Sequence, residues 1–307
     1  MPVRYNCARF IRPAIESVLQ QGYPALEILV TDNASTDNTQ AVVSTVRDSR
    51  IRYLRNPVNL GFAGNLQRAL SLAQHEFLLF LCADDYLYPA YLKKTAARLE
   101  AHTETAYIHT GHHLVDEGGR VVKQRIYPWP ASLEGAAFLR QLARQGMLGV
   151  CLSSVLFRRG WLVRSGGIHR SLESVADYGM WIKLASEGTV EYVPEALVAY
   201  RLHAGQTTGL FMPGLKLQLS ELFLQETRSR GIDCLGFEKV LLKTAVLSSL
   251  RELPRCRIEG ASRSFVLKRA GSLWARYFSL LNLLPGLLYL LVSLLPVALL
   301  RARWSRS

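Results

Sequence analysis

The stretch that decides the fold is Phe77-Leu78-Leu79-Phe80-Leu81-Cys82-Ala83-Asp84-Asp85. Its first five residues are continuously apolar, which predicts a strand buried on both faces. Two carboxylates follow directly, where that strand ends. Upstream, the apolar run 26–31 also looks like a strand, and it ends at Asp32.

Helical patterns alternate with these strands. The apolar spacing predicts helices over 10–21, 62–73 and 91–100, another ending near residue 47, and a strand over 51–54. Alternation at such short spacing predicts an α/β fold, a mostly parallel sheet with helices on both faces. In such sheets ligands bind beyond the carboxyl ends of the strands. Asp32 and the Asp84-Asp85 pair should therefore meet at one crevice.

The second half of the chain has a different pattern. A β-hairpin is predicted from two strand-like runs, 106–115 and 120–126, around a Gly-rich turn. The remaining predicted elements are helices over 133–145, 177–187 and 214–250, and strands over 155–157, 190–193 and 197–202. We expect a domain over 1–210, a helical extension over 211–276 and a tail over 277–307.

The tail is both basic and apolar. The 307-residue chain has a net charge of +13, and no acidic residue follows Glu259. This combination indicates an anionic membrane surface as partner, at the cytoplasmic face of the inner membrane, rather than nucleic acid. Residues 277–300 are long enough to span a bilayer, but Pro285 and Pro296 favour a monotopic or re-entrant anchor. A full span and a soluble buried helix remain open.

Asp84 and Asp85 suit a divalent cation. Mg²⁺ and Mn²⁺ prefer oxygen ligands, and such an ion stabilises the negative charge of a departing diphosphate. A solvated turn is the simpler alternative for an Asp-Asp pair. The preceding buried strand and the second acidic strand end at Asp32 favour the metal.

Several stretches together resemble the family 2 glycosyltransferases, which are inverting enzymes of the GT-A fold. The resemblance implies the kind that builds bacterial cell-surface glycans. The resemblance covers roughly residues 2–205. The matching stretches are Ala14–Leu19, Glu27–Thr39, Asn59–Asn65, Leu81–Asp85, Tyr178–Trp181 and Tyr200–His203.

This resemblance implies roles for individual residues. Asp32 would accept a hydrogen bond from the nucleobase, Asp84 would lie near the ribose or diphosphate, and Asp85 would be the direct metal ligand. His203 could also approach the metal, which would be Mg²⁺ or Mn²⁺. The other residues implied on the nucleotide-sugar side are Tyr5, Asn6, Asn33, Gly61, Asn65 and Arg201.

The resemblance also implies a catalytic base, Asp177. An inverting transfer needs one carboxylate to take the proton of the acceptor hydroxyl. A helix N-cap is the alternative role for Asp177, and both can hold at once. The donor would be a UDP- or dTDP-sugar, and the acceptor a saccharide or a polyprenyl-linked saccharide.

Three positions depart from the family pattern. Ala176 stands where the family has an acidic residue, Gly64 where many relatives have an arginine, and almost no strand precedes Tyr5. A missing central strand would leave a slot in the core, so we expect a translation start further upstream. Ala176 also keeps open a catalytically degenerate relative that binds a nucleotide sugar or a partner. A nucleotidyltransferase and a dinucleotide oxidoreductase are disfavoured, because the required Gly-rich phosphate motifs are missing.

Overall fold

A computed structural model describes residues 2–3, 5–144, 149–168, 175–203 and 215–232. The chain forms two compact units, one of residues 1–142 and 148–209 and the other of residues 143–147 and 210–307. In the second unit the described helix is α8 (Leu215–Ser229). The predicted boundaries at 210 and 276 remain predictions, because most of the extension and the whole tail lie outside the described residues.

A three-stranded parallel sheet forms the first part of the larger unit. Its order is β1 (Pro2–Val3), β2 (Ile28–Asp32) and β3 (Ile51–Arg55). β1 pairs with the end of β2, with Pro2 opposite Thr31. The crossover helices are α1 (Ile11–Leu19), α2 (Thr39–Ser44) and α3 (Gly61–Leu72). The alternation predicted for this part of the chain is confirmed.

The second sheet is mixed, so the prediction of a mostly parallel sheet is wrong here. Its order is β4 (Phe77–Leu79), β9 (Val155–Arg158), β6 (Thr105–Val115), β10 (Thr189–Arg201) and β5 (Tyr86–Leu87). β7 (Val121–Arg125) pairs with β6, and β8 (Ser132–Leu133) pairs with β10. Among these described pairs, β6 and β10 run parallel and the others antiparallel. Hairpin β6–β7 and the long return to β9 cause the difference, because neither is a βαβ crossover.

β10 also differs from the prediction of two strands over 190–193 and 197–202. It is one strand whose register against β6 shifts between Val193 and Ala196. Pro194 lies in this interval, and proline has no N–H to donate to the ladder. The break in the sequence pattern is therefore an irregularity within one strand.

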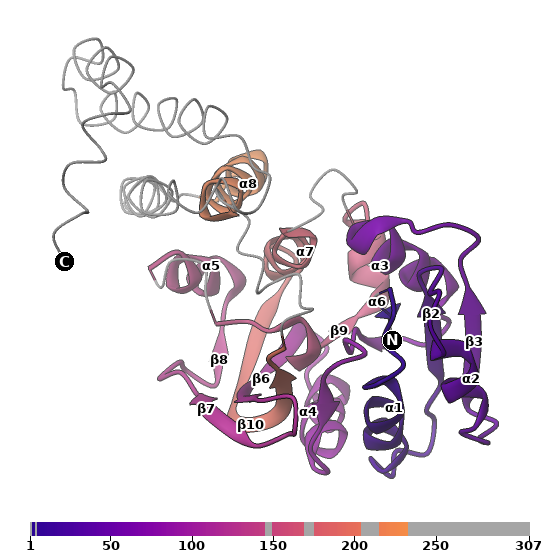
Figure 1. Ribbon diagram of the computed structural model, residues 1–307. Coiled ribbons are helices and arrows are strands. Elements are labelled where there is room, and N and C mark those ends of the chain that lie inside the picture. Colours follow the sequence, from indigo (N-terminus) through magenta and orange to yellow (C-terminus); the bar gives the residue numbers. More distant parts are fainter. Residues whose placement is uncertain (1, 4, 145–148, 169–174, 204–214, 233–307) are drawn as a thin grey trace, which may run out of the picture. The chain divides into compact units, whose positions relative to one another are not determined.

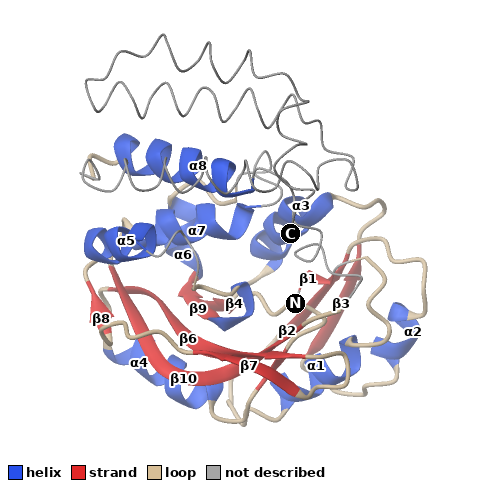
Figure 2. Cartoon of the chain, turned by 60° about the vertical axis from the view of Figure 1, so that its left-hand side comes forward, coloured by secondary structure: helices blue, strands red, loops and turns tan. Residues whose placement is uncertain are grey.

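Helices cover both faces of the strands in the larger unit, as predicted. Figure 2 shows α1, α2 and α4 on one face and α3, α5, α6 and α7 on the other. The helices not yet bounded are α4 (Tyr91–Ala101), α5 (Gly135–Arg144), α6 (Arg159–Arg164) and α7 (Ala176–Ala185) (Figure 1). None of the helices within the described ranges is long and apolar enough to cross a bilayer.

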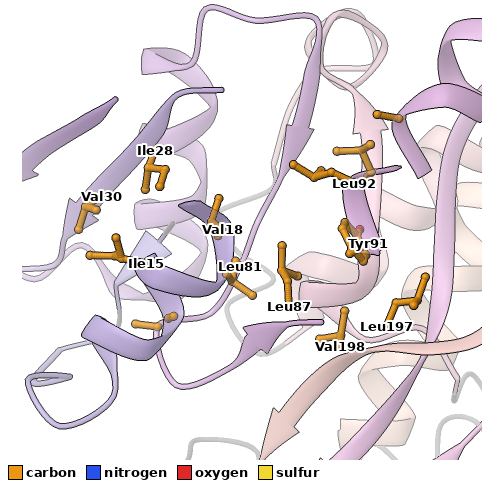
Figure 3. Close-up of a cluster of buried hydrophobic side chains, with 14 of the residues drawn as sticks. Ile15, Val18, Ile28, Val30, Leu81, Leu87, Tyr91, Leu92, Leu197 and Val198 are labelled. Atoms are coloured by element: carbon orange, nitrogen blue, oxygen red, sulfur yellow. The ribbon is translucent and has the colours of Figure 1, made fainter. Parts of the chain in front are cut away.

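The hydrophobic core joins α1 to both sheets. Figure 3 shows side chains of this core, among them Ile15, Val18, Ile28, Leu81, Leu87, Tyr91 and Val198. An apolar cavity of about 260 Å³ adjoins it, lined by Ile28 and Leu29 of β2 and by Phe77 and Leu79 of β4. It lies beside the part of β2 that precedes the pairing with β1.

Candidate active site

Asp84 and Asp85 lie in a tight turn between β4 and β5. The turn is closed by a backbone hydrogen bond of 3.1 Å from Asp85 to the carbonyl of Cys82. The apolar residues before it, Phe80 and Leu81, are buried in the core and fix the start of the turn. The acidic pair therefore has a rigid backbone, as predicted from the preceding strand.

The Asp85 carboxylate is held from two directions. One oxygen accepts a hydrogen bond of 2.9 Å from the backbone N–H of Arg201, and the other accepts one of 2.6 Å from the hydroxyl of Ser153. The side chain is almost fully buried. Burial, and secondly the charge of Asp84, raise the pKa of Asp85 well above its usual value. A positive charge beside Asp85 would lower its pKa again.

Asp84 lies against His203. Oδ2 of Asp84 and Nε2 of His203 are 3.0 Å apart, and their side chains are 6% and 15% exposed. One ligand atom from each of Cys82, Asp84 and Asp85 also lies within 4.8 Å of the other two. Carboxylate oxygens and an imidazole nitrogen at such spacing fit a divalent cation of the Mg²⁺ or Mn²⁺ type. The predicted metal residues are thus brought together.

Arg201 connects this turn to the β6–β7 hairpin. Its guanidinium donates hydrogen bonds to the backbone carbonyls of Asp84 at 2.9 Å, Asp116 at 3.2 Å and Glu117 at 2.8 Å. The same group lies over the rings of Phe10, at 4.9 Å, and Tyr86, at 5.5 Å. These contacts fit a positioning role better than the phosphate contact expected from the sequence.

Asp32 ends β2 and is fully buried. One oxygen accepts hydrogen bonds from the backbone N–H of Ser35 at 3.1 Å and from its hydroxyl at 2.6 Å, and the other accepts one from Tyr53. Arg55 lies 3.9 Å away. Burial, and secondly the bond to Asp32, raise the pKa of Tyr53 above its usual value. Asp32 is therefore already engaged in organising the loop that follows β2.

Asn33, Gly61 and Asn65 belong to a buried amide network. Asn33 donates to Asn59 at 2.7 Å and to the carbonyl of Gly61 at 3.1 Å, and it accepts from Asn56 at 3.1 Å. Asn56 also donates to Asn65 at 2.9 Å. Gly61 has a φ of +73°, a conformation that glycine adopts without strain. The network fixes the β2 loop against the start of α3.

Tyr5 and Asn6 lie beside the same loop. Asn6 accepts a hydrogen bond of 2.9 Å from the backbone of Thr36, and its own N–H donates to Ser35 at 3.0 Å. The Tyr5 hydroxyl is 2.9 Å from that of Thr36, and the Tyr5 ring is 46% exposed. The exposed Tyr5 ring offers surface to a ligand. The chain then leads through Phe10, which contacts His203, to the metal residues.

Asp177 is the second residue of α7 and accepts a hydrogen bond of 3.0 Å from the backbone of Tyr178. Burial raises its pKa to about 6. The pKa of the Cys151 thiol is raised by burial and, after it, by the charges of both Asp85 and Asp177. These effects on one thiol agree with a common site for the predicted base and the predicted metal ligand, whose roles remain predictions.

Sequence reasoning missed Ser153, Tyr53, Cys151 and Phe10. The Tyr53 contact follows from parallel register, since Val30 lies opposite Tyr53 and Asp32 is two residues further along β2. Ser153 lies in a short 3₁₀ segment (Leu152–Ser154) and Cys151 directly precedes it, and this segment has no periodic pattern, so no signal marks them. Phe10 looks like one more apolar residue of the first helical stripe.

Residues 3–164 match the model of glycosyl transferase family 2. This is more than half of the chain, and the chain belongs to that family. The family resemblance is confirmed.

Two bacterial relatives are similar in sequence. The UDP-Glc:α-D-GlcNAc-diphosphoundecaprenol β-1,3-glucosyltransferase WfaP of Escherichia coli is 27% identical over 207 residues, which cover 66% of this chain and 76% of that protein. The putative glycosyltransferase EpsE of Bacillus subtilis is 27% identical over 210 residues, 64% of this chain and 70% of that protein.

Two solved structures are similar in fold. S. aureus TarS (residues 1–349) in complex with UDP-GlcNAc has a TM-score of 0.67 at 19% identity, over 91% of this chain and 79% of that one. The mannosyltransferase PcManGT from Pyrobaculum calidifontis, with GDP-Man and Mn²⁺, has a TM-score of 0.57 at 17% identity, over 99% and 86%. The GT-A-like α/β fold is thereby confirmed.

Proposed function

We propose that this glycosyltransferase is an inverting, divalent-metal-dependent enzyme. It would move a sugar from a nucleoside diphosphate donor to a saccharide or lipid-linked acceptor in bacterial cell-surface glycan synthesis. The observation that carries the proposal is the geometry of the turn after β4, where Asp84 lies 3.0 Å from His203 and the neighbouring Asp85 is held by Ser153 and by the backbone of Arg201. This arrangement supports a metal site, and the raised pKa of Asp177 supports its role as the base.

The metal would be bound by Asp84 and His203. Asp85 would lie next to them without binding the ion directly. Both Asp85 oxygens already accept hydrogen bonds, whereas Asp84 meets an imidazole nitrogen at 3.0 Å. We therefore assign to Asp84 the role of direct ligand, which the family resemblance implied for Asp85. When bound, Mn²⁺ or Mg²⁺ supplies charge that stabilises the leaving diphosphate.

Asp177 would accept the proton of the acceptor hydroxyl. A pKa of about 6 leaves the carboxylate largely ionised at neutral pH, and it makes the group a stronger base than an ordinary aspartate. The backbone N–H of Tyr178 orients the carboxylate. Ala176 before it is buried, so this arrangement needs no acidic neighbour there.

The donor is proposed to be a UDP- or dTDP-sugar. WfaP is named for a UDP-Glc donor and a diphosphoundecaprenol-linked acceptor, and TarS is described with UDP-GlcNAc. These names, with the basic apolar tail of this chain, support a polyprenyl-linked acceptor. The basic apolar tail also supports action at an anionic membrane surface, which we propose to be the cytoplasmic side of the inner membrane.

Nucleotide release from a panel of UDP- and dTDP-sugars, with Mn²⁺ or Mg²⁺, tests the proposal. We expect metal-dependent release that Asp177→Asn abolishes and that the matched surface variant Asp48→Asn leaves unchanged. Donor binding without release by the native chain would favour the alternative, a non-catalytic nucleotide-sugar-binding relative, to which Ala176 gives some support. Release that survives Asp177→Asn would remove the base from the mechanism.

A further inference from the structure

β7 carries an unusual group of exposed apolar side chains. Val121, Val122 and Ile126 are 47%, 58% and 40% exposed, and they are three of the seven large apolar side chains that stand out to solvent in the described part of the chain. Neighbouring residues of a strand point to opposite faces, so Val121 and Val122 expose both faces of β7. Single exposed aliphatics are ordinary, but a cluster on one element indicates an interaction surface.

The same strand is strongly basic. Lys123 and Arg125 lie on β7 and Arg120 directly precedes it, and no acidic residue occurs between Gly118 and Leu133. No ion pair within the described residues involves any of the three cations. The nearest carboxylate along the chain, Glu117, is paired with Arg9.

β7 also has a free edge, since β6 is the strand that pairs with it in the described structure (Figure 1). The chain continues from β7 to Tyr127, whose backbone N–H donates a hydrogen bond of 2.9 Å to the Tyr192 hydroxyl of β10. The β6–β7 turn at the other end is held to Asp84 by Arg201. One end of the exposed strand is therefore anchored at the proposed metal residues and the other at β10.

We propose that β7, with Arg120 and Ile126 at its ends, docks on an anionic lipid surface. The valines and Ile126 enter the boundary between headgroups and acyl chains, and the cations face lipid phosphates. A second copy of the chain is a poorer occupant of this edge, because pairing two such strands brings their cations together. The purpose of the contact rests on the proposed function, since it would bring a lipid-linked hydroxyl to Asp177.

Hydrogen exchange of the full chain tests this inference, because it reports on β7 separately from any other membrane contact. The probes are vesicles of phosphatidylcholine alone and of phosphatidylcholine with phosphatidylglycerol. We expect exchange over 120–126 to slow only with the anionic vesicles. Each basic residue near such a surface contributes roughly fivefold to binding, so Lys123→Glu with Arg125→Glu should abolish the protection. The matched control, Arg47→Glu with Lys93→Glu, changes net charge equally and should retain it.

Three results would overturn the inference. They are unchanged exchange over 120–126 with anionic vesicles, equal protection in the Lys123→Glu, Arg125→Glu variant, and protection that rises with protein concentration without lipid. Exchange of the core strands in the same samples verifies that each variant is folded, and Val122→Ser gives a milder second test. Binding of UDP with Mn²⁺ to the native chain is measured separately. If the native chain does not bind UDP with Mn²⁺ while β7 is still protected by lipid, the proposed function is contradicted and the inference about β7 is not.

Discussion

The ring of Phe10 lies 4.9 Å from the imidazole ring of His203, centroid to centroid. The guanidinium of Arg201 lies over the same phenyl ring, also at 4.9 Å. Phe10 thus contacts Arg201, at the end of β10, and His203, in the segment after it. Both of these residues contact Asp84. Because the imidazole is only partly buried, this contact helps to keep its Nε2 directed at Asp84.

Loss of the Phe10 ring should therefore weaken metal binding. We expect Phe10→Ala to reduce Mn²⁺ affinity roughly fivefold, which corresponds to an aromatic pair contribution on the order of 1 kcal/mol. Phe10→Tyr should restore it. Titration of Mn²⁺ in the presence of UDP measures the effect, and equal affinity in all three proteins would exclude the positioning role.

The proposed base makes activity depend on pH. Burial raises the pKa of Asp177 to about 6, so the ionised form is lost as pH falls below that value. We expect kcat/KM to fall about tenfold per pH unit below pH 6, because only the carboxylate accepts a proton. A pH profile at fixed free Mn²⁺ measures it, and a flat profile down to pH 5 would contradict the assignment.

The burial of Asp177 also lowers the stability of the folded state. The folded pKa exceeds the unfolded one, so above about pH 6 the folded state bears the cost of the buried charge. Asp177→Asn should therefore raise the free energy of unfolding at pH 8 by on the order of 1 kcal/mol, and less at pH 5. Urea denaturation at the two pH values measures both. Asp48→Asn, at a partly exposed carboxylate outside the site, serves as the control.

The contribution of His109 to stability should depend on pH in the opposite direction. Its ring is buried against Trp129, Phe138 and Tyr192, neither nitrogen has a hydrogen-bond partner among the described residues, and burial lowers its pKa to about 3. Between pH 6.5 and 3 the unfolded chain binds a proton that the folded chain does not, so stability is lost as pH falls. His109→Phe should remove part of this loss, by up to about 1.4 kcal/mol per pH unit.

Urea denaturation of His109→Phe and of the native chain at pH 8 and pH 5 checks this. The free energy of unfolding of His109→Phe, relative to that of the native chain, should be higher at pH 5 than at pH 8. His112, whose pKa burial lowers to about 4, retains its own contribution in both proteins. An unchanged difference between the two pH values would show that His109 titrates normally.

The cavity beside β2 predicts a stabilising substitution. Ala96 of α4 is buried and lines this space of about 260 Å³. Ala96→Leu fills part of it without loss of helix propensity, and we expect about 1 kcal/mol of added stability. A higher melting temperature would agree. A drop of about 1–3 kcal/mol, typical of overpacking, would mean that the cavity walls cannot accept the side chain.

The order of elements over residues 10–100 was predictable, because each strand and helix there has its own hydrophobic period. The second sheet was not, because its pairing joins distant segments. Phe77 lies opposite Arg158, and nothing local in either segment indicates an antiparallel partner. The effect of Pro194 was hard to predict for the same reason. The pattern predicts two strands, whereas Pro194 disrupts the register of a single strand.

The site was predictable where one residue type defines the chemistry, and less so where contacts define it. The resemblance implied His203 and Asp85 at the metal and Asp84 near the ribose or diphosphate, and the structure places Asp84 3.0 Å from His203. Ser153 lies 68 residues from Asp85 in sequence, so its hydrogen bond could not be foreseen. Arg201 shows a charge in the sequence, but its acceptors are backbone carbonyls, which no sequence pattern reveals.

The anchoring of the β6–β7 turn by Arg201 limits how this enzyme can diversify. The guanidinium reaches the carbonyls of Asp116 and Glu117, so an insertion in the turn would pull both away and release the backbone of Asp84. Evolution toward new acceptors would then have to leave the turn length alone. Substitutions within the segment from Val121 to Ile126 are changes that leave the acidic pair undisturbed.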